Sequence, residues 1–248
     1  MMLRAALAAI LISLLSVSAF AETARVAIII DDLGYQLAAG RRAIALPGPI
    51  SFAILPGTPR GRQLAETAHQ NGKEVLLHLP LQAVDHEGPT EPDGIMLDMT
   101  RASVGETFKN AMDSVPHAIG VNSHRGSLLT RHPGHMRWLM EEIQEHDALF
   151  FIDSYTTHES VALQVAREQG VEAVKRDVFL DPDTSEETMR RMFERMKTLA
   201  RERGSIIAIG HPYPSTLGFL ERELPGLAAE GIELVPVSEI LRGDGGLN

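Results

Sequence analysis

Five short apolar runs constrain the fold of this chain more than any other feature, because each leads into an acid, an amide or a histidine. The runs contain three to five residues and cover 26–30, 75–77, 118–121, 149–152 and 206–209. Their length and β-branched content are typical of fully buried strands. The polar residues that follow, directly or after one glycine, are Asp31-Asp32, His78, Asn122-Ser123-His124, Asp153-Ser154 and His211.

Strand-like and helix-like segments alternate along the whole chain. We expect strands at 25–30, 50–55, 75–79, 118–122, 148–152, 172–176, 205–209 and 232–236. Helices are expected between them, at 36–46, 59–71, 102–114, 134–146, 158–169, 184–203 and 215–229. This alternation predicts a parallel sheet with right-handed crossovers, and seven or eight repeats favour an α/β fold closed into a (β/α) barrel. An open, doubly wound sheet is the alternative, although no glycine-rich nucleotide-binding motif follows the first strand.

The first residues have the pattern of a targeting segment. Arg4 supplies the positive start, 5–16 form the apolar core, and Ala19-Phe20-Ala21 is a small-x-small cleavage site. We therefore expect a signal peptide over 1–21, a single domain over 22–248, and a periplasmic or secreted protein with no stable membrane insertion after cleavage. An uncleaved membrane anchor is the alternative.

Composition excludes several classes of protein. The formal net charge is −10, and no basic stripe is present that could neutralise phosphates, so we expect no nucleic-acid partner. The chain contains no cysteine, which excludes disulfides, thiolate metal ligands and a cysteine nucleophile.

The polar ends of the strands indicate a metal site. Because parallel strands place their carboxyl ends on one face, residues far apart in sequence are brought together there. Asp31 and Asp32 repel one another unless a divalent cation lies between them, in which case one can bind the cation and the other can act as a base; a simple strand-end turn is the alternative. His78 and His124 are candidate ligands. His211 is a candidate general acid, because an unperturbed histidine titrates near neutrality.

Other polar residues at the same strand ends are expected to bind or orient the substrate. Asn122 and Arg125 flank His124, and Asp153 follows the fifth expected strand. Arg176-Asp177 ends a weaker strand, where Asp177 is expected to pair with Arg176 or to support His124. A purely structural salt bridge is the alternative for this last pair.

Six motifs resemble the divergent polysaccharide deacetylase family, a distant branch of the NodB-type carbohydrate esterases. The resemblance extends from Ala27 to about Leu241 and rests on the segments 28–34, 76–81, 120–127, 151–154, 176–181 and 209–212, which read IIIDDLG, LLHLPL, GVNSHRGS, FIDS, RDVFLD and IGHP.

The resemblance implies a distorted (β/α) barrel with a divalent metal ion, usually zinc. By residue correspondence, Asp31 is the expected base, Asp32 and His78 are metal ligands, and His211 is the general acid. The wider superfamily has a second histidine four residues after the first, where this chain has Gln82; His124 is the expected substitute.

The implied activity is a metal-dependent removal of N-acetyl or O-acetyl groups from an envelope glycan or oligosaccharide. Two alternatives stay open. Gln82 is compatible with a non-catalytic, deacetylase-like protein that binds glycan or a cell-wall enzyme, and a metal hydrolase that cleaves another amide or ester uses the same parts.

Overall fold

The computed structural model describes residues 23–85, 94–146 and 148–243, so the expected signal peptide lies outside the described residues. The strands are β1 (Ala24–Leu33), β2 (Ser51–Ile54), β3 (Val75–Leu81), β4 (Ala118–Arg125), β5 (Phe150–Asp153), β6 (Ala173–Lys175), β7 (Val178–Phe179), β8 (Ser205–Gly210) and β9 (Ile232–Leu234). The α-helices are α1 (Leu37–Ile44), α2 (Gly61–Gln70), α3 (Arg101–Ser114), α4 (Pro133–Glu145), α5 (Ala162–Gln169), α6 (Glu186–Arg203), α7 (Pro214–Glu223) and α8 (Val237–Gly243). Two 3-10 helices, η1 (Leu129–Arg131) and η2 (Leu224–Glu230), complete the described elements.

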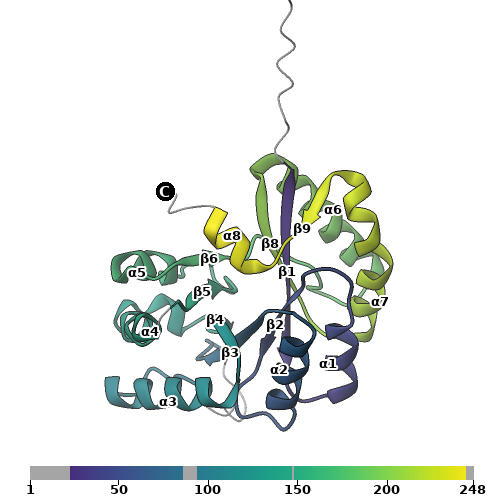
Figure 1. Cartoon of the computed structure of the whole chain (residues 1–248). Coiled ribbons are helices and arrows are strands. Elements are labelled where there is room, and N and C mark those ends of the chain that lie inside the picture. Colours follow the sequence, from purple (N-terminus) through teal and green to yellow (C-terminus); the bar gives the residue numbers. More distant parts are fainter. Residues whose placement is uncertain (1–22, 86–93, 147, 244–248) are drawn as a thin grey trace, which may run out of the picture.

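The strands form one parallel sheet, and the helices α1 to α7 pack on its outside (Figure 1). Its order is β6-β5-β4-β3-β2-β1-β8-β7, and β9 pairs with the first residues of β1. The predicted parallel α/β barrel is therefore confirmed.

The barrel closes in an unusual way, through one extended segment that changes partners. β6 pairs with β5 and β7 pairs with β8, yet only Arg176 and Asp177 separate them in the chain. The Arg176 amide still donates to the carbonyl oxygen of Asp153 at 2.9 Å, whereas the Asp177 amide donates to that of Ile207 at 2.9 Å. The two ends of the sheet are thus joined by a covalent link, and the described residues contain no ladder between β6 and β7. We call this joint the seam.

Two apolar cores lie on opposite faces of the sheet. The larger one fills the space between strands and helices, and the smaller one fills the barrel with side chains from β1, β2, β3, β5, β8 and α8. Gly120 of β4 leaves room for an aromatic ring inside the barrel, because a Cβ at this position would lie 2.4 Å from Cε2 of Phe150. Ile240 and Leu241 of α8 belong to the inner core, and α8 packs against β1 and β8.

The alternation of side chains along the strands positions the site. In β1, Ala27 and Ile29 face the inner core, so Asp31 continues the same row. Ile207 and Ile209 face inward in β8, and His211 follows them with the same spacing. Polar side chains therefore replace the inner core at the carboxyl end of the barrel.

The structure differs from the sequence-based expectation at a few elements. β7 and α8 were not expected, and the segment expected as one helix over 215–229 is divided into α7 and η2. Pro225 lies in the first turn of η2, and proline removes a helical donor and clashes with the preceding turn, so α7 ends before it. None of the described helices is both long enough and apolar enough to cross a membrane.

Candidate metal centre and active site

Three side chains meet at the carboxyl end of the barrel in a group that could hold a metal ion: Asp32 near the end of β1, His78 of β3 and His124 of β4. Asp32 Oδ1 lies 3.0 Å from His78 Nε2 and 3.0 Å from His124 Nδ1. The two imidazole nitrogens are themselves 3.0 Å apart. Asp32 has a left-handed backbone with φ 59°, a conformation that aspartate tolerates better than most residues. This turn directs Asp32 as well as Asp31 to the site.

The donor set fits a divalent cation of the zinc type. Zinc binds imidazole nitrogen and carboxylate oxygen at about 2.0–2.2 Å, so its ligand atoms lie roughly 3–3.5 Å from one another. Two imidazole nitrogens at 3.0 Å that share one carboxylate oxygen cannot direct protons at each other, whereas a cation satisfies all three atoms. The expected ligands Asp32, His78 and His124 are therefore brought together by the structure.

The electrostatics of the group also favour positive charge. Burial opposes the protonation of His78, but the carboxylates of Asp31 and Asp32 outweigh it and raise the pKa of this histidine. Burial acts to raise the pKa of Asp32, but hydrogen bonds from His124 and His78 lower it well below its usual range. The carboxylates of Asp31 and Asp32 thus favour a positive charge at the place where the three ligand atoms meet.

Asp31 lies beside this group and is almost fully buried. Its Oδ1 accepts a hydrogen bond of 2.7 Å from Nδ2 of Asn122, and its Oδ2 lies 3.7 Å from Nε2 of His78. Burial raises the pKa of Asp31, against the opposing charges of nearby histidines. Asn122 cannot turn its amide, because its Oδ1 accepts a hydrogen bond of 2.5 Å from the Ser154 hydroxyl. Asn122 thus holds the Asp31 carboxylate through its own fixed amide.

His211 approaches the group from the end of β8, the neighbour of β1 in the sheet, with Nε2 3.7 Å from Asp32 Oδ2. Its other nitrogen, Nδ1, lies 3.0 Å from Oδ1 of Asp181, whose Oδ2 accepts bonds from the His211 backbone amide at 2.8 Å and from the Thr216 hydroxyl at 2.7 Å. Burial alone would lower the pKa of His211. The hydrogen bond to Asp181, together with the charges of two nearby carboxylates, raises it to about 9. His211 is therefore held as a charged donor near neutral pH.

Sequence reasoning did not assign a function to Asp181. It closes the segment 176–181, and a buried acid that follows a strand was a usable signal. Its meaning depends on β7 lying beside β8, which brings Asp181 to His211.

A sequence profile described as "Divergent polysaccharide deacetylase" matches residues 28–241. The chain belongs to this family. Among similar proteins, the uncharacterized protein YibQ of Escherichia coli K12 is 36% identical over 229 residues, covering 92% of this chain and 71% of YibQ. The crystal structure of the uncharacterized protein ATU2773 from Agrobacterium tumefaciens C58 has a TM-score of 0.84 at 22% identity and covers 89% of this chain and 90% of its own. BA3943, a CE4 family pseudoenzyme from Bacillus anthracis, has a TM-score of 0.51 at 12% identity, covering 89% of this chain and 66% of its own. At these identities the structural likenesses show a shared fold.

Gln82 occupies the position where the resemblance led us to expect a second histidine, and the structure shows what its side chain binds. The Gln82 Oε1 accepts a hydrogen bond of 2.8 Å from the backbone amide of Leu97. Its own carbonyl oxygen accepts from the amides of Leu128 and Leu129 at 3.1 and 3.0 Å. Gln82 thus holds the loops around Leu97 and Leu128 together, and His124 is the third member of the candidate metal group.

Two of the residues expected to bind or orient the substrate, Asp153 and Arg176, form hydrogen bonds within the turn after β5. Asp153 accepts hydrogen bonds from the Tyr155 amide at 2.8 Å and from the Ser160 hydroxyl at 2.6 Å. Arg176 donates to the carbonyl oxygens of Ser154 at 2.7 Å and of Tyr155 at 3.3 Å. Both therefore act on the loop after β5.

Asp177 does not have the partners that the sequence led us to expect. Its carboxylate binds Arg203 at 2.9 Å and accepts a hydrogen bond of 2.9 Å from the Ile207 amide, so it contacts neither Arg176 nor His124 in the expected manner. Asp177 faces the helix α6 because it follows the partner change at the seam. Arg125 is exposed at the end of β4 with φ 57°, and its carbonyl oxygen accepts a hydrogen bond of 2.7 Å from the Thr156 hydroxyl.

Proposed function

We propose that this protein is a metal-dependent hydrolase of the cell envelope that removes acetyl groups from an amino sugar of a glycan. One observation carries the proposal: three ligand atoms at mutual distances of 3.0 Å lie between a buried carboxylate and a positioned histidine. Family membership supports the substrate class, and the expected signal peptide supports a periplasmic location.

The residues divide the chemistry between them. Asp32, His78 and His124 would hold the cation. When bound, a divalent cation, zinc by its donor set, polarises the acetyl carbonyl and lowers the pKa of a water molecule. Asp31, whose pKa is raised by burial, takes a proton from the attacking water.

His211 completes the reaction from the other side. Its Nε2 donates a proton to the leaving nitrogen as the C–N bond breaks, which yields acetate and an amine. Asp181 keeps Nδ1 protonated and the ring in place, so that Nε2 faces the site. For an O-acetyl substrate the same proton goes to the leaving oxygen.

The test combines metal analysis with acetate release. We expect stoichiometric zinc in the purified protein and its loss in Asp32→Ala and His78→Ala. Acetate release from N-acetylated chitooligosaccharides, peptidoglycan fragments and an O-acetylated panel should depend on metal and should vanish in Asp31→Asn. A wild-type protein that cannot be loaded with metal would remove this mechanism. N-terminal sequencing of the exported protein tests cleavage after Ala21.

A second candidate is a glycan-binding protein without turnover. It is favoured by Gln82 and by the shared fold with BA3943, for which a mutant with restored enzymatic activity also exists. The complete group of Asp32, His78 and His124 favours catalysis instead. Sustained turnover that Asp31→Asn abolishes would exclude the binding protein.

A further inference from the structure

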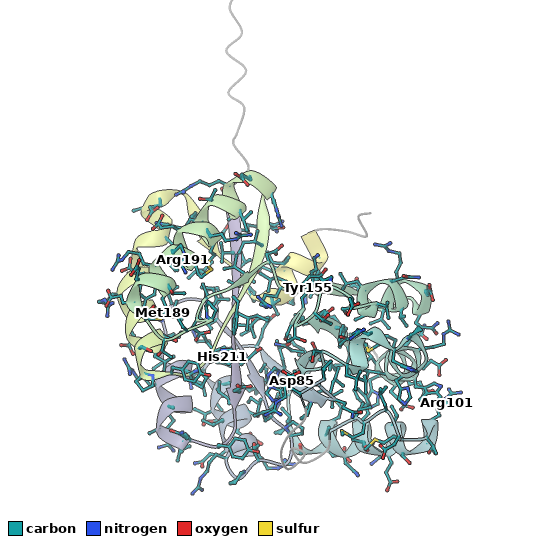
Figure 2. All side chains as sticks on the ribbon, turned by 180° about the vertical axis from the view of Figure 1, so that it is seen from behind. Asp85, Arg101, Tyr155, Met189, Arg191 and His211 are labelled. Carbon is teal, nitrogen blue, oxygen red and sulfur yellow. The ribbon has the colours of Figure 1, made fainter. Side chains whose placement is uncertain are left out.

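The aromatic side chains that could pack against a sugar are concentrated at the carboxyl end of the barrel. The chain contains only three tyrosines and one tryptophan. Tyr35 follows β1, Tyr155 follows β5 and Tyr213 follows β8, whereas Trp138 lies on α4 and packs against the outer core. Tyr35 is 51% exposed and Tyr213 is 43% exposed. In Figure 2, Tyr155 and His211 both lie in the middle of the molecule, between the two groups of helices.

Tyr155 is held in a backbone conformation that a bulky residue rarely adopts. Its φ is 51°, in the left-handed region where glycine and asparagine are common. Asp153 holds the Tyr155 amide at 2.8 Å, and Arg176 binds the Tyr155 carbonyl oxygen at 3.3 Å. Strain of this kind persists where surrounding contacts enforce it, and it is concentrated at functional sites.

A cation lies over this ring. Lys175 Nζ is 4.2 Å from the centroid of the Tyr155 ring, and Lys175 is exposed. No carboxylate of the described residues forms an ion pair with Lys175, and the nearest acid along the chain, Asp177, binds Arg203. The buried Asp153 carboxylate is already occupied by the Tyr155 amide and by Ser160. In a protein of net charge −10, this side of the barrel mouth therefore carries a positive group beside an aromatic one.

Tyr155 is connected to the candidate base Asp31 through a short chain of hydrogen bonds. Ser154, the neighbour of Tyr155, donates to Asn122, and Asn122 donates to Asp31. Tyr155 therefore lies on the β5 side of the candidate base, one residue from a side chain that is hydrogen-bonded to its partner Asn122.

We propose that Tyr155 and Lys175 form a subsite for a sugar that carries a carboxylate and adjoins the acetylated sugar. The inference rests on the proposed function for the identity of the reacting sugar. The ring of Tyr155 packs against the apolar face of the sugar, and Lys175 binds its carboxylate.

The test measures binding in the Asp31→Asn background, so that turnover does not interfere. The probes are the disaccharide of N-acetylglucosamine and N-acetylmuramic acid and the methyl ester of the same disaccharide, which lacks the negative charge. Tyr155→Asn should weaken both ligands about five- to tenfold while the melting temperature stays the same or rises, because asparagine tolerates the left-handed backbone. Lys175→Gln should weaken only the free acid, by about two- to fivefold.

Two controls are matched to these variants. Ala148→Gly relieves a left-handed residue of φ 67° before β5, away from the carboxyl ends, and should leave both dissociation constants unchanged. Lys109→Gln removes an exposed charge from α3, where Lys109 pairs with Asp113. It should also leave both dissociation constants unchanged.

The subsite is overturned if the Asp31→Asn protein binds neither probe, if Tyr155→Asn binds both as well as its parent, or if Lys175→Gln weakens the ester as much as the acid. Acetate release by the wild-type protein from the same disaccharide separates this result from the proposed function. If the wild-type protein releases acetate but Tyr155→Asn and Lys175→Gln bind the probes as their parent does, only the subsite is refuted. If the variants show the expected losses of affinity but no acetate is released, only deacetylation of this substrate is refuted.

Discussion

Replacement of Asp181 by asparagine tests how the protein positions His211. The substitution keeps the shape of the side chain but removes its charge. In the wild type, one oxygen accepts the His211 amide and the Thr216 hydroxyl, and the other lies 3.0 Å from His211 Nδ1. An asparagine that keeps the first two bonds turns its NH2 group toward Nδ1. The imidazole must then accept at Nδ1, so it is neutral.

The expected loss of stability in Asp181→Asn follows from the pKa of His211, which is raised from 6.5 to about 9. A raised histidine pKa contributes stability that is fully present below pH 6.5 and is lost as the pH rises through about 9. That difference corresponds to about 3 kcal/mol for all contributing groups. The bond to Asp181 is the largest of the contributions that raise the pKa, so the variant should lose about 2 kcal/mol at pH 6, in the range for a hydrogen bond to a charged group. The melting temperature should fall by about 4–8 °C.

Urea unfolding of the wild type and of Asp181→Asn, with a chelator present, measures this loss. The difference between the two free energies of unfolding should narrow between pH 6 and pH 10, because the wild type loses its charged His211 over that range. With metal and substrate supplied, kcat should fall by about 10²–10³ while KM stays within about twofold. A difference in stability that is equal at pH 6 and pH 10 would refute the assignment of the charge to this pair.

Three further predictions concern residues that shape the barrel. Gln82→His should not add metal to the protein and should lower the free energy of unfolding by about 1 kcal/mol, because the bond to the Leu97 amide is lost; metal analysis and urea unfolding measure both. Gly120→Ala should destabilise by about 1–3 kcal/mol in thermal unfolding, since its methyl group collides with the Phe150 ring, and an unchanged melting temperature would contradict this packing. Arg176→Met should cost about 1–3 kcal/mol through two lost bonds to carbonyl oxygens, and urea unfolding that matches the wild type would show that the seam does not need them.

The apolar runs carried most of the information that the sequence held about the fold and the site. Buried parallel strands have a strong local pattern, and their carboxyl ends must share one face. This is why Asp32, His78 and His124 could be placed together although more than ninety residues separate the first from the last. His124 could replace the missing histidine because β4 pairs with β3 in a register that sets Asn122 opposite His78.

What the sequence did not reveal depends on partners chosen in space. β7 contains two residues, too few for a periodic pattern, so the function of Asp181 beside β8 was not visible. Asp177 was assigned to its sequence neighbour Arg176, but the partner change at the seam directs it to Arg203. The short helix α8 packs its apolar side chains into the inner core, so packing and not helix propensity decides its formation.

The seam has a consequence for how such proteins can diversify. Elsewhere in the wall, an inserted residue shifts a hydrogen-bonded register and turns every following side chain to the other face. Between β6 and β7, where no ladder links the two strands, additional residues would widen the opening of the barrel and leave each pairing intact. Relatives can therefore differ in loop length at this joint while the strands that carry Asp32, His78 and His124 keep their spacing.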